Sequence, residues 1–351
     1  IEFGQESLKL SDKIGYVNGA ATSNSNIGRA YKLSGQFEKA IEHLILALKL
    51  EVQTNDVRGQ AVNHNELGNT YKYIAEYAKS LHHFQEAIRL FEELEEEQSV
   101  ASVKMNTAYL HQYLGNFEKA VPLCQQVLEL KKKSDSALGE AKSCLCLGIS
   151  YNGLEKLDSA LLYFERSLTI LKTLNNRTYL PAALNNVGAV YSQLGDNDRA
   201  ISVITEAISI SDSLGHKNNV AIGYSDLGDV FMDAKKYEDA VDAFAKSLLL
   251  VEETGSSLVK VSTLEKKSRA LSQLGKFELA FQTRMEYEAL NDSLRSSDKE
   301  KELLKLQEEF DAEKREQEIE RLKIEQESTE VKANLSNLLL ASSLALLLLL
   351  S

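Results

Sequence analysis

A period of forty residues runs through most of this chain, and it limits the folds that the chain can adopt. A first column holds small residues: Gly28, Gly68, Ala108, Gly148, Gly188, Gly228 and Ser268. A second column follows each of these by sixteen residues and is mostly apolar: Leu44, Phe84, Cys124, Phe164, Ile204, Phe244 and Arg284. Two more columns, which begin at Tyr31 and Ala40, keep the same register. Four columns that stay in step over seven copies indicate a repeat protein.

Each forty-residue unit predicts two amphipathic helices joined by a turn, because apolar residues recur three and four positions apart in each half. In the fifth unit the helices are expected at about 181–194 and 197–214, with Pro181 in the first helical turn, where its missing N–H costs nothing. Gly195 lies in the turn between them. One hairpin cannot bury its apolar face alone, so we predict an all-α solenoid in which each unit contacts its neighbours.

The second unit carries the clearest family pattern, Leu67-Gly68-x-x-Tyr71 and then Ser80-x-x-x-Phe84-x-x-Ala87. This pattern resembles the tetratricopeptide repeat, and the unit length resembles its forty-residue subclass. The resemblance implies a right-handed superhelix of helix hairpins. We expect seven repeats over residues 21–296, preceded at 1–20 by the second helix of a truncated repeat. Because the chain starts with Ile1 inside a repeat, we also expect a fragment or a processed chain.

The periodicity changes after the repeats. Residues 297–333 are rich in Glu and Lys and lack Gly and Pro, so we predict a long charged helical rod. A heptad column from Leu303 is mostly apolar, but its partner column is mostly acidic, which leaves open both a single exposed helix and a coiled-coil homodimer. Residues 334–351 carry no charge and are dominated by Leu, so we expect the start of a transmembrane helix there.

Repeats, a charged rod and a membrane span in this order resemble the extracytoplasmic half of membrane-bound sensor histidine kinases and related regulators. The resemblance implies a sensory module that binds a protein or peptide in a concave groove and couples through the rod to the membrane. It also implies a membrane-anchored location, with the repeats in the periplasm or, as the alternative, in the cytoplasm. The alternative function is a scaffold, tail-anchored or soluble, that assembles a protein complex without a signalling output.

Polar residues follow one face of the first helix of the units, on both sides of the small column. We predict a peptide-binding groove formed by Asn26, Arg29, Asn65, Asn69, Asn106, Tyr109, Asn185, Asn186, Asp226 and Asp229. Asparagine is a poor helix former, and its amide offers donors and an acceptor to the backbone of an extended peptide. The competing interpretation is that each Asn braces a neighbouring helix, and both roles can hold together.

Composition and motifs point away from other function classes. With 52 acidic against 40 basic residues the net charge is −12, and no basic stripe is visible, so we expect no nucleic-acid partner. The sequence contains no phosphate-binding glycine motif and no H-E-x-x-H, and we expect no metal site at His82 and His83. We therefore predict no catalytic residue, no cofactor and no metal, and no enzyme activity in this chain. Cys124, Cys144 and Cys146 are expected to be packing residues.

Overall fold

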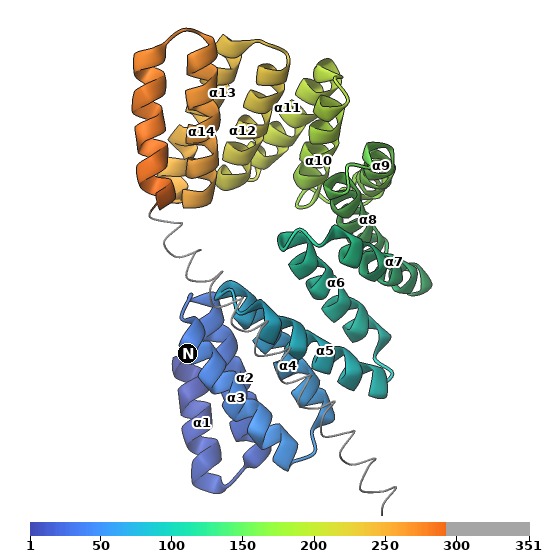
Figure 1. The fold of residues 1–351 in the computed structure, drawn as a ribbon. Helices are drawn as coiled ribbons and strands as arrows, with labels where there is room; N and C mark the ends of the chain where they lie inside the picture. The colour runs from blue at the N-terminus through green and yellow to red at the C-terminus, as the bar shows by residue number, and fades with distance from the viewer. Residues whose placement is uncertain (293–351) are drawn as a thin grey trace, which may run out of the picture. The chain divides into compact units, whose positions relative to one another are not determined.

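The computed structural model describes residues 1–292, which are helical almost throughout (Figure 1). The complete helices in this part of the chain are α1 (Glu2–Ile14), α2 (Val17–Leu33), α3 (Phe37–Gln53), α4 (Val57–Tyr73), α5 (Tyr77–Glu93), α6 (Glu97–Tyr113), α7 (Phe117–Lys133), α8 (Ala137–Gly153), α9 (Leu157–Thr173), α10 (Leu180–Gln193), α11 (Asn197–Ser213), α12 (Lys217–Asp233), α13 (Tyr237–Thr254) and α14 (Ser257–Gln273). A further helical stretch begins at Phe277 and reaches the end of the described residues.

A residue with positive φ follows every one of these helices, and such residues recur every twenty positions. In the turns inside the hairpins the residues with positive φ are Gly35, Ala75, Gly115, Glu155, Gly195, Lys235 and Gly275. In the turns between hairpins they are Gly15, Asn55, Glu95, Asp135, Asn175, Gly215 and Gly255. In the turn at Gly35 the N–H of Gln36 donates to the carbonyl of Tyr31 at 2.9 Å. This turn satisfies carbonyls that the end of a helix leaves without a partner.

The helices stack as successive hairpins. Each helix packs against the next one in the chain, and the first helices of adjacent units also touch: α2 and α4, α4 and α6, α6 and α8, α8 and α10, α10 and α12, α12 and α14. Among the described helices, no second helix touches the second helix of another unit. Because the first helices of adjacent units touch one another and the second helices do not, the first helices form the inner side of the curve that the hairpins follow in Figure 1. We call the solvent-facing side of this layer, formed by α2, α4, α6, α8, α10, α12 and α14, the inner face.

The core of each unit forms where the small column meets the apolar column. A Cβ placed on Gly68 would lie 2.6 Å from the ring of Phe84, whose side chain is fully buried. The hydroxyl of Ser80 donates to the carbonyl of Gly68 at 2.6 Å and ties the two helices together at the same level. The third unit keeps this contact with a different pair, Ala108 and Cys124, which are also fully buried. The small column therefore lets the two helices of a unit approach over a buried side chain.

The structure corrects one element of the expected fold, the transmembrane helix. Within residues 1–292, no helix is both long enough and apolar enough to cross a bilayer. The segment 334–351, to which we assigned the span, lies outside the described residues. Over residues 1–292 the protein is an all-α helical solenoid without a membrane-spanning helix, and this replaces the fold that we expected. The same finding overturns the membrane-anchored location with periplasmic repeats, because that location required a span.

Two further expectations are not tested by the structure. The charged rod over 297–333, with its coiled-coil homodimer, lies outside the described residues and stays a prediction. The division of the chain into a truncated repeat at 1–20 and seven repeats at 21–296 also stays a prediction.

Candidate functional site

Several pockets open on the inner face. One, of about 530 Å³, lies between α6 and α8 and reaches the start of α10. Another, of about 320 Å³, lies between α10 and α12. We call these two the first and the second pocket; a further one, of about 280 Å³, lies between α12 and α14. Residues of the first helices line most of both, so both belong to the face on which the sequence predicted a groove.

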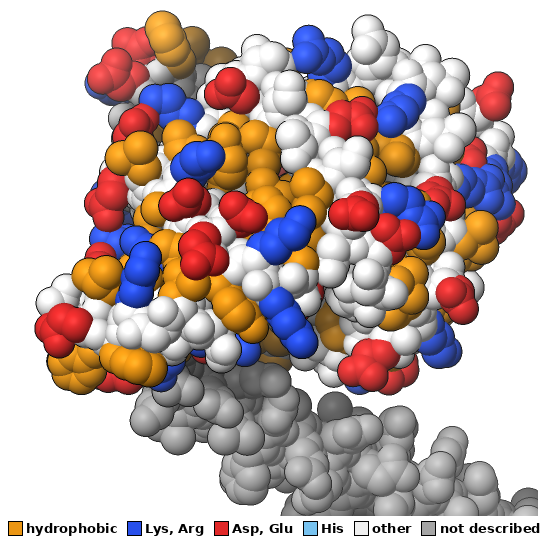
Figure 2. Space-filling model, turned by 90° about the horizontal axis from the view of Figure 1, so that it is seen from above, with side chains coloured by type: hydrophobic (Ala, Val, Ile, Leu, Met, Phe, Trp, Pro, Cys, Tyr) orange, Lys and Arg blue, Asp and Glu red, His pale blue; other side chains and the backbone are white. Residues whose placement is uncertain are grey.

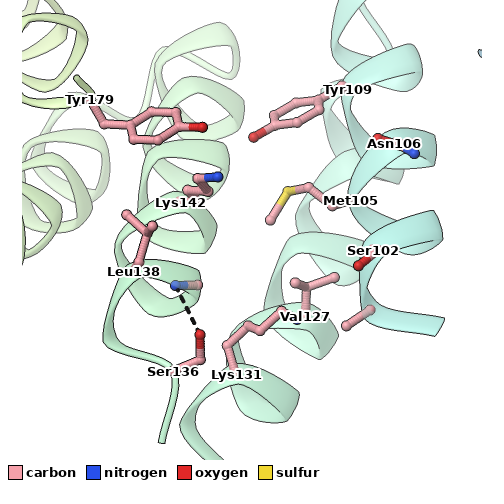
Figure 3. Close-up of a pocket in the computed structure, with 12 residues that line it drawn as sticks. Ser102, Met105, Asn106, Tyr109, Val127, Lys131, Ser136, Leu138, Lys142 and Tyr179 are labelled. Atoms are coloured by element: carbon pink, nitrogen blue, oxygen red, sulfur yellow. Dashed lines mark hydrogen bonds between the residues drawn. The ribbon is translucent and has the colours of Figure 1, made fainter. Parts of the chain in front are cut away.

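The first pocket combines an apolar floor with an aromatic rim. Met105 of α6, Val127 of α7 and Leu138 of α8 contribute apolar side chains to its lining. Figure 3 shows Tyr109 and Tyr179 on opposite sides of the pocket, with Lys142 beside Tyr179. The ammonium nitrogen of Lys142 lies 4.2 Å from the centroid of the Tyr179 ring, which is close enough for a cation–π interaction. The pocket can therefore accept an apolar or aromatic group between two rings.

The first pocket also carries uncompensated positive charge. Lys131 and Lys142 line it, and none of the described residues in its wall is Asp or Glu. The Nζ of Lys131 donates to the side-chain oxygen of Gln98 at 2.6 Å, which is a neutral partner. Burial and, secondly, the charge of Lys142 lower the pKa of Lys131, so the two ammonium groups affect one another. A negatively charged ligand group would relieve this repulsion.

The second pocket gathers three residues of the predicted groove, namely Asn185, Asn186 and Asp226. The side-chain amide of Asn186 donates to the carbonyl of Ala182 at 2.8 Å, on its own helix. The side-chain oxygen of Asn185 is buried and accepts no hydrogen bond from the described residues. Burial raises the pKa of Asp226 to about 7, although Lys266 opposes this shift. The pocket therefore combines apolar residues with polar side chains that can hydrogen-bond a peptide backbone.

Two other predicted residues brace neighbouring helices. The amide of Asn106 on α6 donates to the side-chain oxygen of Asn65 on α4 at 3.0 Å. This bond is a contact that the bracing interpretation expects. The amide of Asn69, in contrast, donates to the backbone carbonyl of Asn65 on its own helix, also at 3.0 Å. Asn106 lines the first pocket as well, so at this position bracing and exposure to a ligand occur together.

The remaining predicted residues lie toward the two ends of the inner face. Asn26 and Arg29 on α2 are exposed, and the Nε of Arg29 lies 3.7 Å from a carboxylate oxygen of Glu66. At the other end Asp229 forms an ion pair with Lys266 at 2.6 Å. The structure therefore places the predicted residues on one layer of helices but divides them between separate pockets and braces.

Sequence reasoning missed the residues that give the first pocket its character, which are Lys131, Lys142 and Tyr179. Lys142 is the one basic residue in its column of the repeat, where the other units have Thr22, Val62, Ser102, Ala182, Ile222 and Ser262. Tyr179 lies where the repeat loses its spacing, because α10 begins at Leu180, three residues later than the twenty-residue spacing of the other helices predicts. Both departures were readable in the sequence as breaks in the pattern.

The cysteines depart from the expectation of simple packing. Cys124 and Cys146 form a disulfide between α7 and α8, with their Cα atoms 6.0 Å apart, while Cys144 is free and buried. Packing of α7 against α8 brings the two positions together, which their sequence spacing alone did not reveal. Within the described part of the chain, no group of three or more metal-ligating side chains comes together. On the face seen in Figure 2, Lys and Arg side chains are interspersed with Asp and Glu.

Several solved structures have the same fold. The apo form of RapI aligns with a TM-score of 0.66 at 17% identity, covering 80% of this chain and 99% of RapI. The apo form of the quorum sensor NprR from B. thuringiensis aligns with a TM-score of 0.65 at 14% identity, covering 82% of this chain and 81% of NprR. A Rap protein complexed with competence and sporulation factor aligns with a TM-score of 0.60 at 15% identity, covering 80% of this chain and 76% of the Rap protein. At these identities the likeness concerns the fold alone.

Sequence comparison supports the repeat and not the wider organisation. The search of curated proteins finds no match. The tetratricopeptide repeat family matches residues 19–93, 99–173, 140–213 and 179–246, which together make up more than half of the chain. None of these findings supports the resemblance to histidine kinase sensor regions, whereas the family resemblance carried by the repeat columns is confirmed. The chain belongs to the tetratricopeptide repeat family.

Proposed function

We propose that this chain binds an extended peptide segment of a partner protein along its inner face. The observation that carries the proposal is the pair of pockets on one layer of helices, between α6 and α8 and between α10 and α12. Packed helices lie about 8–10 Å apart, so two steps along the layer separate the pockets by roughly 20 Å. An extended chain rises about 3.3 Å per residue, so a segment of about six residues would reach from one pocket to the other.

Family membership and structural neighbours support this proposal. As a tetratricopeptide repeat protein, the chain is a protein-binding repeat module and not an enzyme. Among the similar folds, one Rap protein is complexed with competence and sporulation factor, and NprR is described as a quorum sensor. Their ligands do not transfer to this chain, but they give a reason to look for a peptide or protein partner on the same layer of helices.

Of the two roles that the sequence left open, the scaffold is better supported than the membrane-coupled sensor. The sensor role needs a membrane span, and no helix in residues 1–292 provides one. The scaffold role needs only a binding face on stacked repeats, which the two pockets supply. We therefore propose that binding on the inner face assembles this chain with a partner protein.

Selection of phage-displayed random dodecapeptides on the immobilised protein tests the proposal. Enriched peptides are synthesised with a fluorescent label, and their affinity is measured by anisotropy. We expect Tyr109→Ala in the first pocket and Asn185→Ala in the second to weaken binding by about tenfold each, since contacts at the centre of an interface carry most of its energy. Circular dichroism establishes that each variant remains folded.

The matched control is Leu249→Ala on α13. Leu249 is a large apolar residue, 68% exposed, on a second helix and therefore outside the inner face. Its truncation should change peptide affinity by less than about twofold, because a contact outside the interface contributes nothing. Failure to enrich any peptide, or equal loss of binding in the control and the two pocket variants, would contradict the proposed function.

A further inference from the structure

The residues that line the first pocket favour particular kinds of peptide side chain. Its apolar lining, from Met105, Val127 and Leu138, favours an aliphatic or aromatic side chain, because burial of such a group removes apolar surface from water. A volume of about 530 Å³ exceeds what one side chain needs and lies within the range of about 300–1,000 Å³ that small-ligand pockets span. The pocket therefore has room for two neighbouring side chains of a peptide.

The charges of the pocket determine what the second side chain must be. Lys131 and Lys142 line the pocket, and none of the described residues that line it carries a carboxylate. The nearest acidic residue on α8, Glu140, already pairs with Arg166 through a bond to Nε at 3.0 Å. This local excess of positive charge occurs in a chain whose net charge is −12. The pocket is thus complementary to a negatively charged group, in contrast to most of the protein.

The position of the pocket indicates where the carboxylate comes from. It lies near the middle of the stacked units, and the second pocket continues the inner face toward α12. In the other direction the inner face continues over α4 and α2, so a peptide that follows this face can pass through the first pocket without ending there. In such a peptide the carboxylate belongs to a side chain, since the terminal carboxylate lies elsewhere.

We propose that the first pocket binds an internal pair of peptide residues, one apolar or aromatic and the other Asp or Glu. The apolar side chain packs on Met105, Val127 and Leu138 between the rings of Tyr109 and Tyr179. The carboxylate lies beside the ammonium groups of Lys131 and Lys142. This inference rests on the proposed function and adds to it the class of segment that the inner face recognises, an acidic peptide with an adjacent apolar residue.

A set of capped octapeptides tests the inference. Each peptide is acetylated and amidated, so that no terminal charge is present, and has Gly and Ser around a central pair: Phe-Asp, Phe-Asn, Phe-Lys or Ser-Asp. We expect Phe-Asp to bind about tenfold more tightly than Phe-Asn and to be weakened by added NaCl, because a partly exposed charge pair is screened by salt. The peptides with Phe-Lys and Ser-Asp should bind no more tightly than the peptide with Phe-Asn.

Protein variants assign the preference to the pocket. Lys142→Met keeps the length of the side chain but removes its charge, and it should reduce the ratio of Phe-Asp to Phe-Asn affinity by about fivefold or more, because that charge faces the carboxylate. Lys246→Met is the matched control, since Lys246 also lies over a tyrosine ring, 5.5 Å from the centroid of Tyr224, but on the second helix α13. The control should leave the affinity ratio unchanged.

Three outcomes overturn the inference. Equal affinity for Phe-Asp and Phe-Asn overturns it, and so does an affinity ratio that Lys142→Met leaves intact. Binding confined to peptides with a free terminal carboxylate, measured with uncapped Phe-Asn peptide, overturns the assignment to a side chain. In each of these cases the phage-selected peptides still bind and still respond to Asn185→Ala, so the proposed function survives. If the selected peptides do not bind at all, the proposed function itself fails.

Discussion

A Cβ placed on Gly148 would lie 2.4 Å from the ring of Phe164, and the ring is 1% exposed. The same relationship recurs at Gly68 with Phe84 and at Gly228 with Phe244, two repeats before and two repeats after Gly148. Such a distance is shorter than atoms tolerate, so the absent side chain at the glycine makes room for the ring. Helix α8 and helix α9 pack at this separation only because position 148 has no Cβ.

Gly148→Ala should therefore destabilise the protein, by about 1–3 kcal/mol, because an added methyl group in a packed core forces the ring or the helix to move. Thermal melting followed by circular dichroism measures the effect. The double variant Gly148→Ala with Phe164→Leu should lose less stability than the sum of the two single variants, since the smaller side chain leaves space for the methyl group. Additive losses would contradict a direct contact.

Much of the helical architecture could be predicted from the sequence, because the same pattern of small and apolar residues recurs in every repeat. Pro181 and Gly195 marked a helix start and a turn, and the structure has α10 at Leu180–Gln193 and α11 at Asn197–Ser213. The contact between the small and apolar columns was not predicted and became visible only in the packing of the two helices. The transmembrane helix was wrong because uniform apolar composition was the only evidence for it, and the described helices contain no span.

The candidate site was less predictable, because repeat columns locate a face but not the contacts on it. The sequence placed Asn106 and Asn65 on one face, yet it could not decide whether their amides meet. The pocket residue Tyr179 belongs to a turn that departs from the repeat, and such a departure does not reveal which pocket the side chain lines. Local hydrogen bonding and irregular turns depend on the packing of adjacent units, which a single repeat does not encode.

Asn106→Ala should lower the stability by about 1 kcal/mol, because the side-chain oxygen of Asn65 loses its donor from the next unit. The matched control is Asn26→Ala, which changes the equivalent residue of another unit. Asn26 is exposed, so its loss should change stability by less than about 0.5 kcal/mol. Urea unfolding followed by circular dichroism compares the two variants, and equal effects would contradict a bracing role for Asn106.

Lys235→Gly should raise the stability by about 1 kcal/mol. Lys235 has a φ of 58° in the turn between α12 and α13, a conformation that costs non-glycine residues energy and that Gly195 adopts at the equivalent point of the preceding unit. Greater freedom of glycine in the unfolded chain offsets part of the gain. Gly195→Ala is the reciprocal variant and should lower the midpoint of thermal unfolding. A decrease on Lys235→Gly would show that this turn is not strained.

Glu51→Gln should change how stability depends on pH. Burial raises the pKa of Glu51 from 4.5 to about 7, while the amide of Asn63 donates to one carboxylate oxygen at 2.6 Å and opposes the shift. Between these two values the unfolded chain has released the proton and the folded protein still holds it. The contribution of Glu51 to stability therefore falls as the pH rises from 4.5 to 7, and the loss is complete above 7.

The Glu51→Gln variant and the unchanged protein should consequently have similar stability at about pH 3.5, since the carboxyl is then mostly protonated in both states. At pH 8 the variant should be more stable by on the order of 2 kcal/mol, because it avoids a buried negative charge. Urea unfolding at several pH values measures the difference. Glu38→Gln, at an exposed position on the same helix α3, is the control and should leave the pH dependence unchanged. A difference between the variant and the unchanged protein that stays constant from pH 4.5 to 8 would contradict the titration of Glu51 in this range.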